Sequence, residues 1–78
     1  MGSDKRYGVY GVAYRMWRGT VNWEQRPRFA SDNLDEARRY FENEVKGSTN
    51  GNGCILVDYN FKKVITCKYK ENGTIHTL

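Results

Sequence analysis

The segment between Ser31 and Lys46 constrains the fold most, because apolar residues change their period there. Within it they are three or four positions apart, as on one face of an α-helix. These residues are Leu34, Ala37, Phe41 and Val45. Asp32 or Asn33 can cap the first turn, and Lys46 followed by Gly47 favours a stop. The sequence therefore predicts one amphipathic helix between extended segments.

Two runs before this segment alternate apolar and polar residues with the period of β-strands. A two-residue loop at Arg18–Gly19 would pair them as a hairpin, with Tyr14 opposite Trp23 on the face toward the helix. That face would consist of Tyr10, Val12, Tyr14, Met16, Val21 and Trp23. Pro27 has no amide hydrogen, so we expect the second run to lie at a sheet edge or to stop pairing near Arg26.

Three strands are predicted after the helix. The glycine-rich residues 47–53 are expected to form a surface loop. Residues 54–59 and 63–70 are rich in β-branched and aromatic side chains, and Asn72–Gly73 is a strong signal for a tight turn before residues 74–78. The sequence thus favours an antiparallel meander in this half of the chain.

The register of the meander follows from its turns. A two-residue loop at Asn60–Phe61 would place Val57 opposite Val64 and Cys54 opposite Cys67. The turn at residues 72–73 would place His76 opposite Tyr69. Both arrangements give chemically compatible cross-strand pairs.

The expected fold is a small single α+β domain with the order ββαβββ, in which an antiparallel sheet packs on one helix and leaves its other face open. A chain of 78 residues suits one hydrophobic core. We expect residues 1–5 to be a disordered N-terminus or a tag remnant, and residues 6–78 to be the domain.

Cys54 and Cys67 allow two interpretations. Directly opposite positions on paired strands are close enough for a disulfide, which would indicate a small secreted cationic protein. We favour two reduced, buried thiols in a cytoplasmic protein. Two cysteines and a single histidine fit no common metal-ligand spacing, so no metal is expected.

The sequence indicates no reaction, cofactor or membrane span. His76 is the only histidine, and no nucleophile motif or orienting third residue accompanies it. The longest apolar run is Cys54 to Val57, whereas a membrane helix needs about 20 apolar residues. We therefore expect a non-enzymatic protein in the cytoplasm.

Positive charge is concentrated before the helix. The formal net charge is +4, to which residues 1–30 contribute +4, residues 31–47 contribute −2 and residues 48–78 contribute +2. The predicted hairpin would interleave guanidinium groups with an indole on its outer face, which suits nucleic acid. The candidate residues are Arg15, Trp17, Arg18, Asn22, Arg26 and Arg28, with Lys62, Lys63, Lys68 and Lys70 adding to the positive field.

The sequence therefore predicts a small basic binding module whose first partner class is nucleic acid. The same face could instead bind an acidic protein surface, as in an adaptor or inhibitor among the accessory proteins of bacteria and phages. It could also pair two copies of the chain, so both a monomer and a homodimer remain open. In the simplest alternative, the arginines only protect a sheet edge from aggregation.

Overall fold

Helix α1 covers Leu34–Lys46, as the apolar period predicts. The computed structural model describes residues 5–13, 17, 19 and 21–77. Asn33 is the N-cap, and its side-chain Oδ1 accepts a hydrogen bond from the amide of Glu36 at 3.1 Å. Helix α1 buries one stripe, made up of Ala37, Phe41 and Val45.

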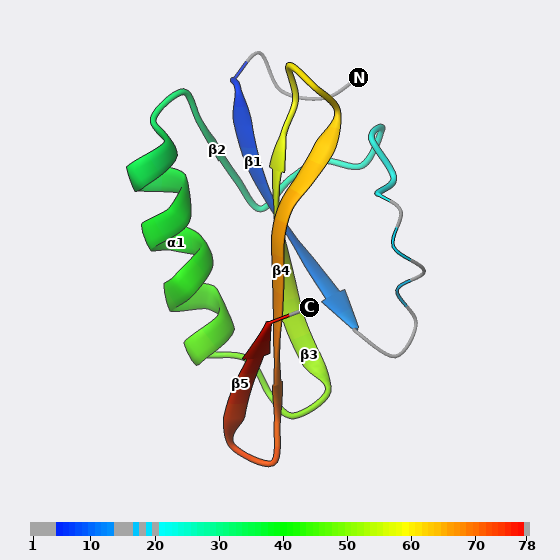
Figure 1. Cartoon of the computed structure of the whole chain (residues 1–78), viewed down its shortest axis with the longest axis vertical. Helices are drawn as coiled ribbons and strands as arrows, with labels where there is room; N and C mark the ends of the chain where they lie inside the picture. The colour runs from blue at the N-terminus through cyan, green and yellow to red at the C-terminus, as the bar shows by residue number, and fades with distance from the viewer. Residues whose placement is uncertain (1–4, 14–16, 18, 20, 78) are drawn as a thin grey trace.

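The described residues form one antiparallel sheet of five strands. The strands are β1 (Tyr7–Ala13), β2 (Phe29–Ser31), β3 (Asn52–Asp58), β4 (Lys63–Glu71) and β5 (Thr74–Thr77). They lie in the order β2-β1-β3-β4-β5, so β1 and β3, which are distant in sequence, are neighbours inside the sheet (Figure 1). The predicted α+β class and ββαβββ order are confirmed.

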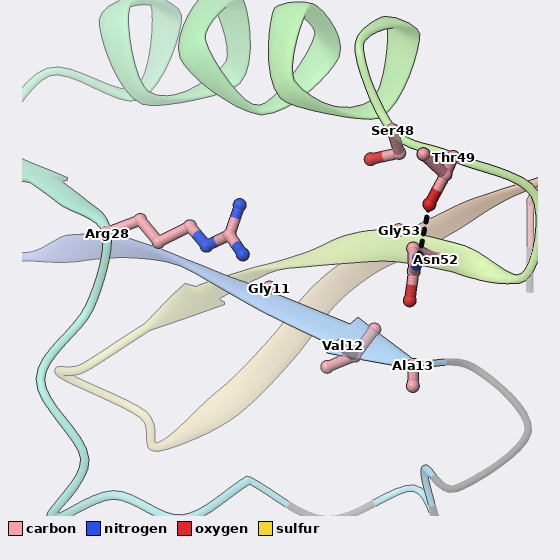
Figure 2. Close-up of a pocket in the computed structure, with 8 residues that line it drawn as sticks. All are labelled: Gly11, Val12, Ala13, Arg28, Ser48, Thr49, Asn52 and Gly53. Atoms are coloured by element: carbon pink, nitrogen blue, oxygen red, sulfur yellow. Dashed lines mark hydrogen bonds between the residues drawn. The ribbon is translucent and has the colours of Figure 1, made fainter.

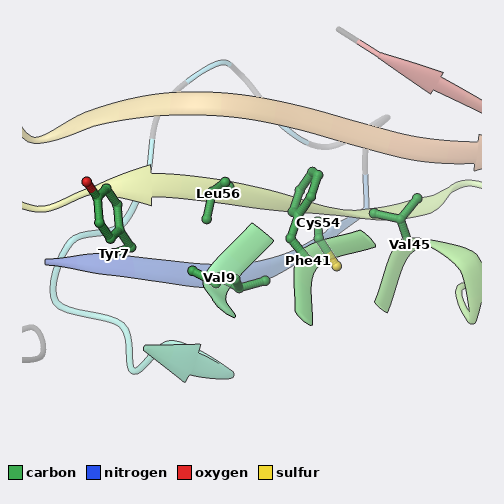
Figure 3. Close-up of a cluster of buried hydrophobic side chains, with 7 residues drawn as sticks. Tyr7, Val9, Phe41, Val45, Cys54 and Leu56 are labelled. Atoms are coloured by element: carbon green, nitrogen blue, oxygen red, sulfur yellow. The ribbon is translucent and has the colours of Figure 1, made fainter. Parts of the chain in front are cut away.

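One face of the sheet packs against α1 and forms the larger core. Val9 of β1 pairs with Leu56 of β3, and the side chains of both are fully buried beside Phe41 of α1 (Figure 3). Tyr7 and Cys54 extend the same cluster along the two strands. Burying several aliphatic and aromatic side chains together supplies most of the favourable free energy of such a small fold.

The opposite face carries a second, smaller cluster centred on Tyr10. Its other buried members are Ile55, Val57 and Cys67. Partly buried side chains pack against them, including Trp17, Val21 and Trp23 from the connection between β1 and β2. Figure 1 shows α1 on one side of the sheet and residues 21–28 of this connection on the other.

The expectation that α1 covers the face with Tyr10 is therefore wrong. Tyr10 belongs to the second cluster together with Val12, Val21 and Trp23, whereas α1 covers Tyr7 and Val9. The physical reason is that residues 7–10 are buried on both sides of β1. Alternation along this strand therefore does not separate core from solvent.

The predicted antiparallel pairing of the two runs before α1 is confirmed only for residues 7–9 with residues 29–31, and its register differs by one residue from that of a two-residue loop at Arg18–Gly19. Along its whole described length, Tyr7–Ala13, β1 pairs with β3, which the hairpin hypothesis did not include. Tyr14, Arg15, Met16 and Arg18 lie outside the described residues. Pairing on the other edge of β1 is confined to β2, which begins after Pro27, as its missing amide hydrogen favours.

The β3–β4 register is confirmed near the turn and wrong further along. Asp58 faces Lys63 and Val57 faces Val64, as predicted. Ile65 is then an extra residue in β4, because the next pair is Leu56 with Thr66. Such a bulge shifts the remaining pairs by one position.

This shift separates the two cysteines. Cys54 now faces Lys68, and Cys67 faces Ile55. Cys54 belongs to the cluster under α1 and Cys67 to the cluster on the other face. The predicted pairing of Cys54 with Cys67, on which the possible disulfide depended, is therefore wrong, and both cysteines are buried, free thiols.

The final turn follows its sequence signal. Asn72 and Gly73 both have positive φ angles, 52° and 78°, as tight hairpin turns of this type require. His76 lies opposite Tyr69 as predicted, and their rings are stacked with centroids 5.2 Å apart.

Within the described residues, no helix is long and apolar enough to cross a membrane.

Candidate nucleic-acid interface

Among the residues that the sequence proposed for binding, those that the structure describes do not share one face. Trp17 is partly buried against the second cluster, and Asn22 accepts a hydrogen bond from the amide of Glu24 within a turn. Arg26 is exposed in the same connection. Arg15 and Arg18 lie outside the described residues. That proposal depended on the outer face of a regular hairpin. The structure instead has residues 21–28 in neither helix nor strand.

Arg28 points toward α1 instead of away from it. Its Nη1 donates to Oε1 of Glu44 at 3.0 Å, and its guanidinium lies in the space that a side chain at Gly11 would need. Arg28 lines a pocket whose volume is about 380 Å³. Figure 2 shows its guanidinium among the other lining residues. Because Glu44 partners the guanidinium, this pocket is a poor site for phosphate.

The polar groups in this pocket are also bonded within the protein. Ser48 Oγ donates to the carbonyl oxygen of Glu44 at 2.8 Å, and Asn52 Nδ2 donates to Thr49 Oγ1 at 2.6 Å. The remaining lining residues are Gly11, Val12, Ala13 and Gly53. The pocket is thus mainly a structural junction between the end of α1 and the sheet.

Two of the four predicted lysines are bound to α1. Lys68 Nζ contacts both carboxylate oxygens of Glu42, at 3.0 and 2.8 Å. Lys70 Nζ donates to the carbonyl oxygen of Lys46 at 2.6 Å, at the negative end of the helix dipole. Both ammonium groups therefore have acceptors on α1, which joins β4 to the helix.

The other two lysines lie beside an exposed aromatic ring. Phe61 is 66% exposed, and the Arg6 guanidinium carbon lies 6.0 Å from its ring centroid. Lys63 Nζ lies 5.6 Å from the same centroid. Lys62, between Phe61 and Lys63 in the sequence, is also exposed. We call these four residues, Arg6, Phe61, Lys62 and Lys63, the Phe61 surface.

Asp58 organises the backbone beneath the Phe61 surface. Its Oδ1 accepts from the amide of Asn60 at 2.9 Å, which fixes the start of the turn. Its Oδ2 lies 3.5 Å from Arg6 Nη2, and the amide of Tyr59 donates to the Arg6 carbonyl at 2.7 Å. Asp58 is only 5% exposed, so its own carboxylate adds little accessible negative charge beside Phe61.

A groove of about 320 Å³ adjoins the Phe61 surface. Its walls include Val21, Trp23 and Val64, and Lys62 and Lys63 also line it. Trp23 packs edge-to-face on Tyr59 with ring centroids 6.1 Å apart. We call this feature the Trp23 groove.

The buried titratable groups near these sites are not set up for nucleophilic chemistry. Burial raises the pKa of the Cys54 and Cys67 thiols from 9.0 to about 11. Burial and the hydrogen bond with Tyr10, 2.6 Å between hydroxyl oxygens, raise the pKa of Tyr59. No cluster of metal-ligating side chains occurs among residues 5–13, 17, 19 and 21–77.

Sequence reasoning missed Arg6 and Phe61. It placed Phe61 in a turn but assigned it no role, and it gave Arg6 no role either. The available signal was the order Phe61-Lys62-Lys63, an aromatic residue and two cations at the tip of a predicted hairpin. Family models, curated proteins and solved structures were compared with the chain, and none of them matched.

Proposed function

We propose that this protein is a non-enzymatic, cytoplasmic binding module that binds single-stranded nucleic acid through the Phe61 surface. The observation that carries the proposal is the 66% exposed Phe61 ring with two cationic groups within about 6 Å of its centroid. An exposed ring offers a stacking face to a base, and nearby cations can neutralise phosphates. The partner class is the one that the sequence suggests, but the contact region is different.

The charge distribution favours a single strand over a duplex. Unpaired bases expose the faces that an aromatic ring can stack on, whereas a duplex covers them. The segment that contains α1, residues 31–47, carries a net charge of −2. A helix within a negatively charged segment is unsuited to the major groove of DNA. Two buried, free thiols support the cytoplasmic location, where thiols stay reduced.

The first test is binding of a labelled oligonucleotide of about 15 nucleotides, measured by fluorescence anisotropy at about 50 mM salt. Phe61→Ala should weaken binding about 5- to 150-fold, because stacking contributes about 1 to 3 kcal/mol per base. Ile75→Ala is the matched control, since Ile75 is the other exposed large hydrophobic residue among those described. That control should bind like the wild-type protein.

Two outcomes would contradict the proposal. Equal binding by wild-type protein and Phe61→Ala would show that the ring makes no contact. No binding at about 50 mM salt would exclude nucleic acid, because electrostatic affinity is strongest at low salt. The second outcome would favour an acidic protein surface as the partner class.

A further inference from the structure

We infer that the Trp23 groove receives a second base of the same single strand, an inference that rests on the proposed function. The strand would place one base on Phe61 and another against Trp23, with the β3–β4 turn between them. The groove would therefore extend the site beyond a single stacking contact.

The lining of the groove matches the chemistry of a nucleotide. The groove has an apolar and aromatic wall, formed by Val21, Trp23 and Val64, which suits the face of a base. Lys62 and Lys63 supply positive charge, and the described lining contains no acidic residue. A base with its attached phosphate satisfies both parts of this lining, whereas a purely apolar ligand would leave the two lysines without a partner.

The β3–β4 turn connects the groove to the Phe61 surface. Lys63 lines the groove, and its Nζ also lies 5.6 Å from the Phe61 ring centroid. Lys62 belongs to both features and has a positive φ of 47°, so the chain changes direction there. A strand that crosses this turn would meet the two lysines with the phosphates between its bound bases.

The indole is held in place before any ligand arrives. Trp23 packs on Tyr59 with an interplanar angle of 67°, and Tyr59 in turn shares a hydrogen bond with Tyr10. Tyr10 is 3% exposed and anchors this arrangement in the second cluster. A wall ordered in advance loses little side-chain freedom on binding, which favours affinity.

The test uses the fluorescence of Trp23. The chain has two tryptophans, so Trp17→Phe leaves Trp23 as the only indole. Adding the oligonucleotide to this variant should quench its emission along the anisotropy isotherm. Bound oligonucleotide should also lower quenching by acrylamide at least about twofold, as a stacked base covers the ring.

A second measurement covers the case in which Trp17→Phe does not fold. Wild-type protein labelled with 5-fluorotryptophan gives one ¹⁹F signal for each indole, and the signal that Trp23→Phe removes should move on titration. Binding that depends on Phe61 while Trp23 emission, acrylamide quenching and both ¹⁹F signals stay unchanged would overturn the groove inference alone. Absence of any oligonucleotide binding would overturn the proposed function as well.

Discussion

At the scale of single residues, Gly53 shows how closely two strands approach each other. A Cβ atom there would overlap the Lys68 carbonyl oxygen and lie 2.5 Å from Tyr69 Cα. Both are backbone atoms, so neither can turn aside as the end of a side chain could. The side chain that is missing at Gly53 is thus part of the pairing between β3 and β4.

We expect Gly53→Ala to lower the free energy of unfolding by about 1 to 3 kcal/mol or more, as overpacking in a core does. Urea denaturation followed by circular dichroism measures this loss. Gly47→Ala is the control, because a Cβ atom added there would lie 3.6 Å from the Asn43 carbonyl oxygen, an ordinary contact, and the φ of Gly47 is −84°. That variant should stay within about 1 kcal/mol of the wild-type protein, and equal stability of the two variants would contradict the close approach.

Because the pKa of both cysteine thiols is raised, we expect the free energy of unfolding to fall at alkaline pH. Their pKa is about 11 in the folded protein and near the ordinary 9.0 in an unfolded chain. The folded state therefore holds more protons between these values, so the free energy of unfolding falls as pH rises from about 9 to about 11. Urea denaturation across this range measures the slope, and a variant with Cys54→Ala and Cys67→Ala should lose this part of it.

At the scale of elements, the structures set by local signals were predictable. Helix α1 and the β4–β5 hairpin depend on a cap, an apolar stripe and a two-residue turn, all of which lie close together in sequence. The placement of β1 was not predictable, because its neighbour β3 lies some forty positions away and both of its faces are buried. The bulge at Ile65 has no sequence signal that we can identify.

The N-cap of α1 gives the prediction at this scale. Asn33→Ala removes the acceptor for the Glu36 amide and should lower the free energy of unfolding by about 1 kcal/mol. Thermal denaturation would show this as a lower Tm. Asn43→Ala, at an exposed position inside the same helix, should have no such cost. A larger loss in the control would mean that capping is not what holds this end.

The candidate site was predictable only in its residue types. The sequence correctly indicates cations and aromatic rings on strands and turns, but their sharing of a face depends on tertiary packing. Arg28 shows this directly, since its partner Glu44 belongs to a helix that the hairpin hypothesis placed on the other side. Phe61 could be identified only once its exposure was known. It lies in the four-residue turn between β3 and β4, where its ring is exposed.

At the scale of the whole molecule, the number of free cations sets the salt dependence of binding. Lys62→Ala and Lys63→Ala should each reduce the slope of log affinity against log salt by about 1. Lys68→Ala is the matched control, because Glu42 already holds that ammonium at 2.8 Å. Anisotropy titrations at several salt concentrations measure the three slopes. Equal slopes for all variants would show that the phosphate contacts lie elsewhere on the protein.

Val21 and Trp23 pack against the cluster centred on Tyr10, although residues 21–28 form neither helix nor strand. These two side chains cover part of the sheet face that α1 leaves free. A reporter inserted between these residues would displace Val21 and Trp23 from the second cluster and expose one face of the sheet to solvent. The Asn72–Gly73 turn, whose two residues are exposed, is the better place to attach a dye or an affinity handle.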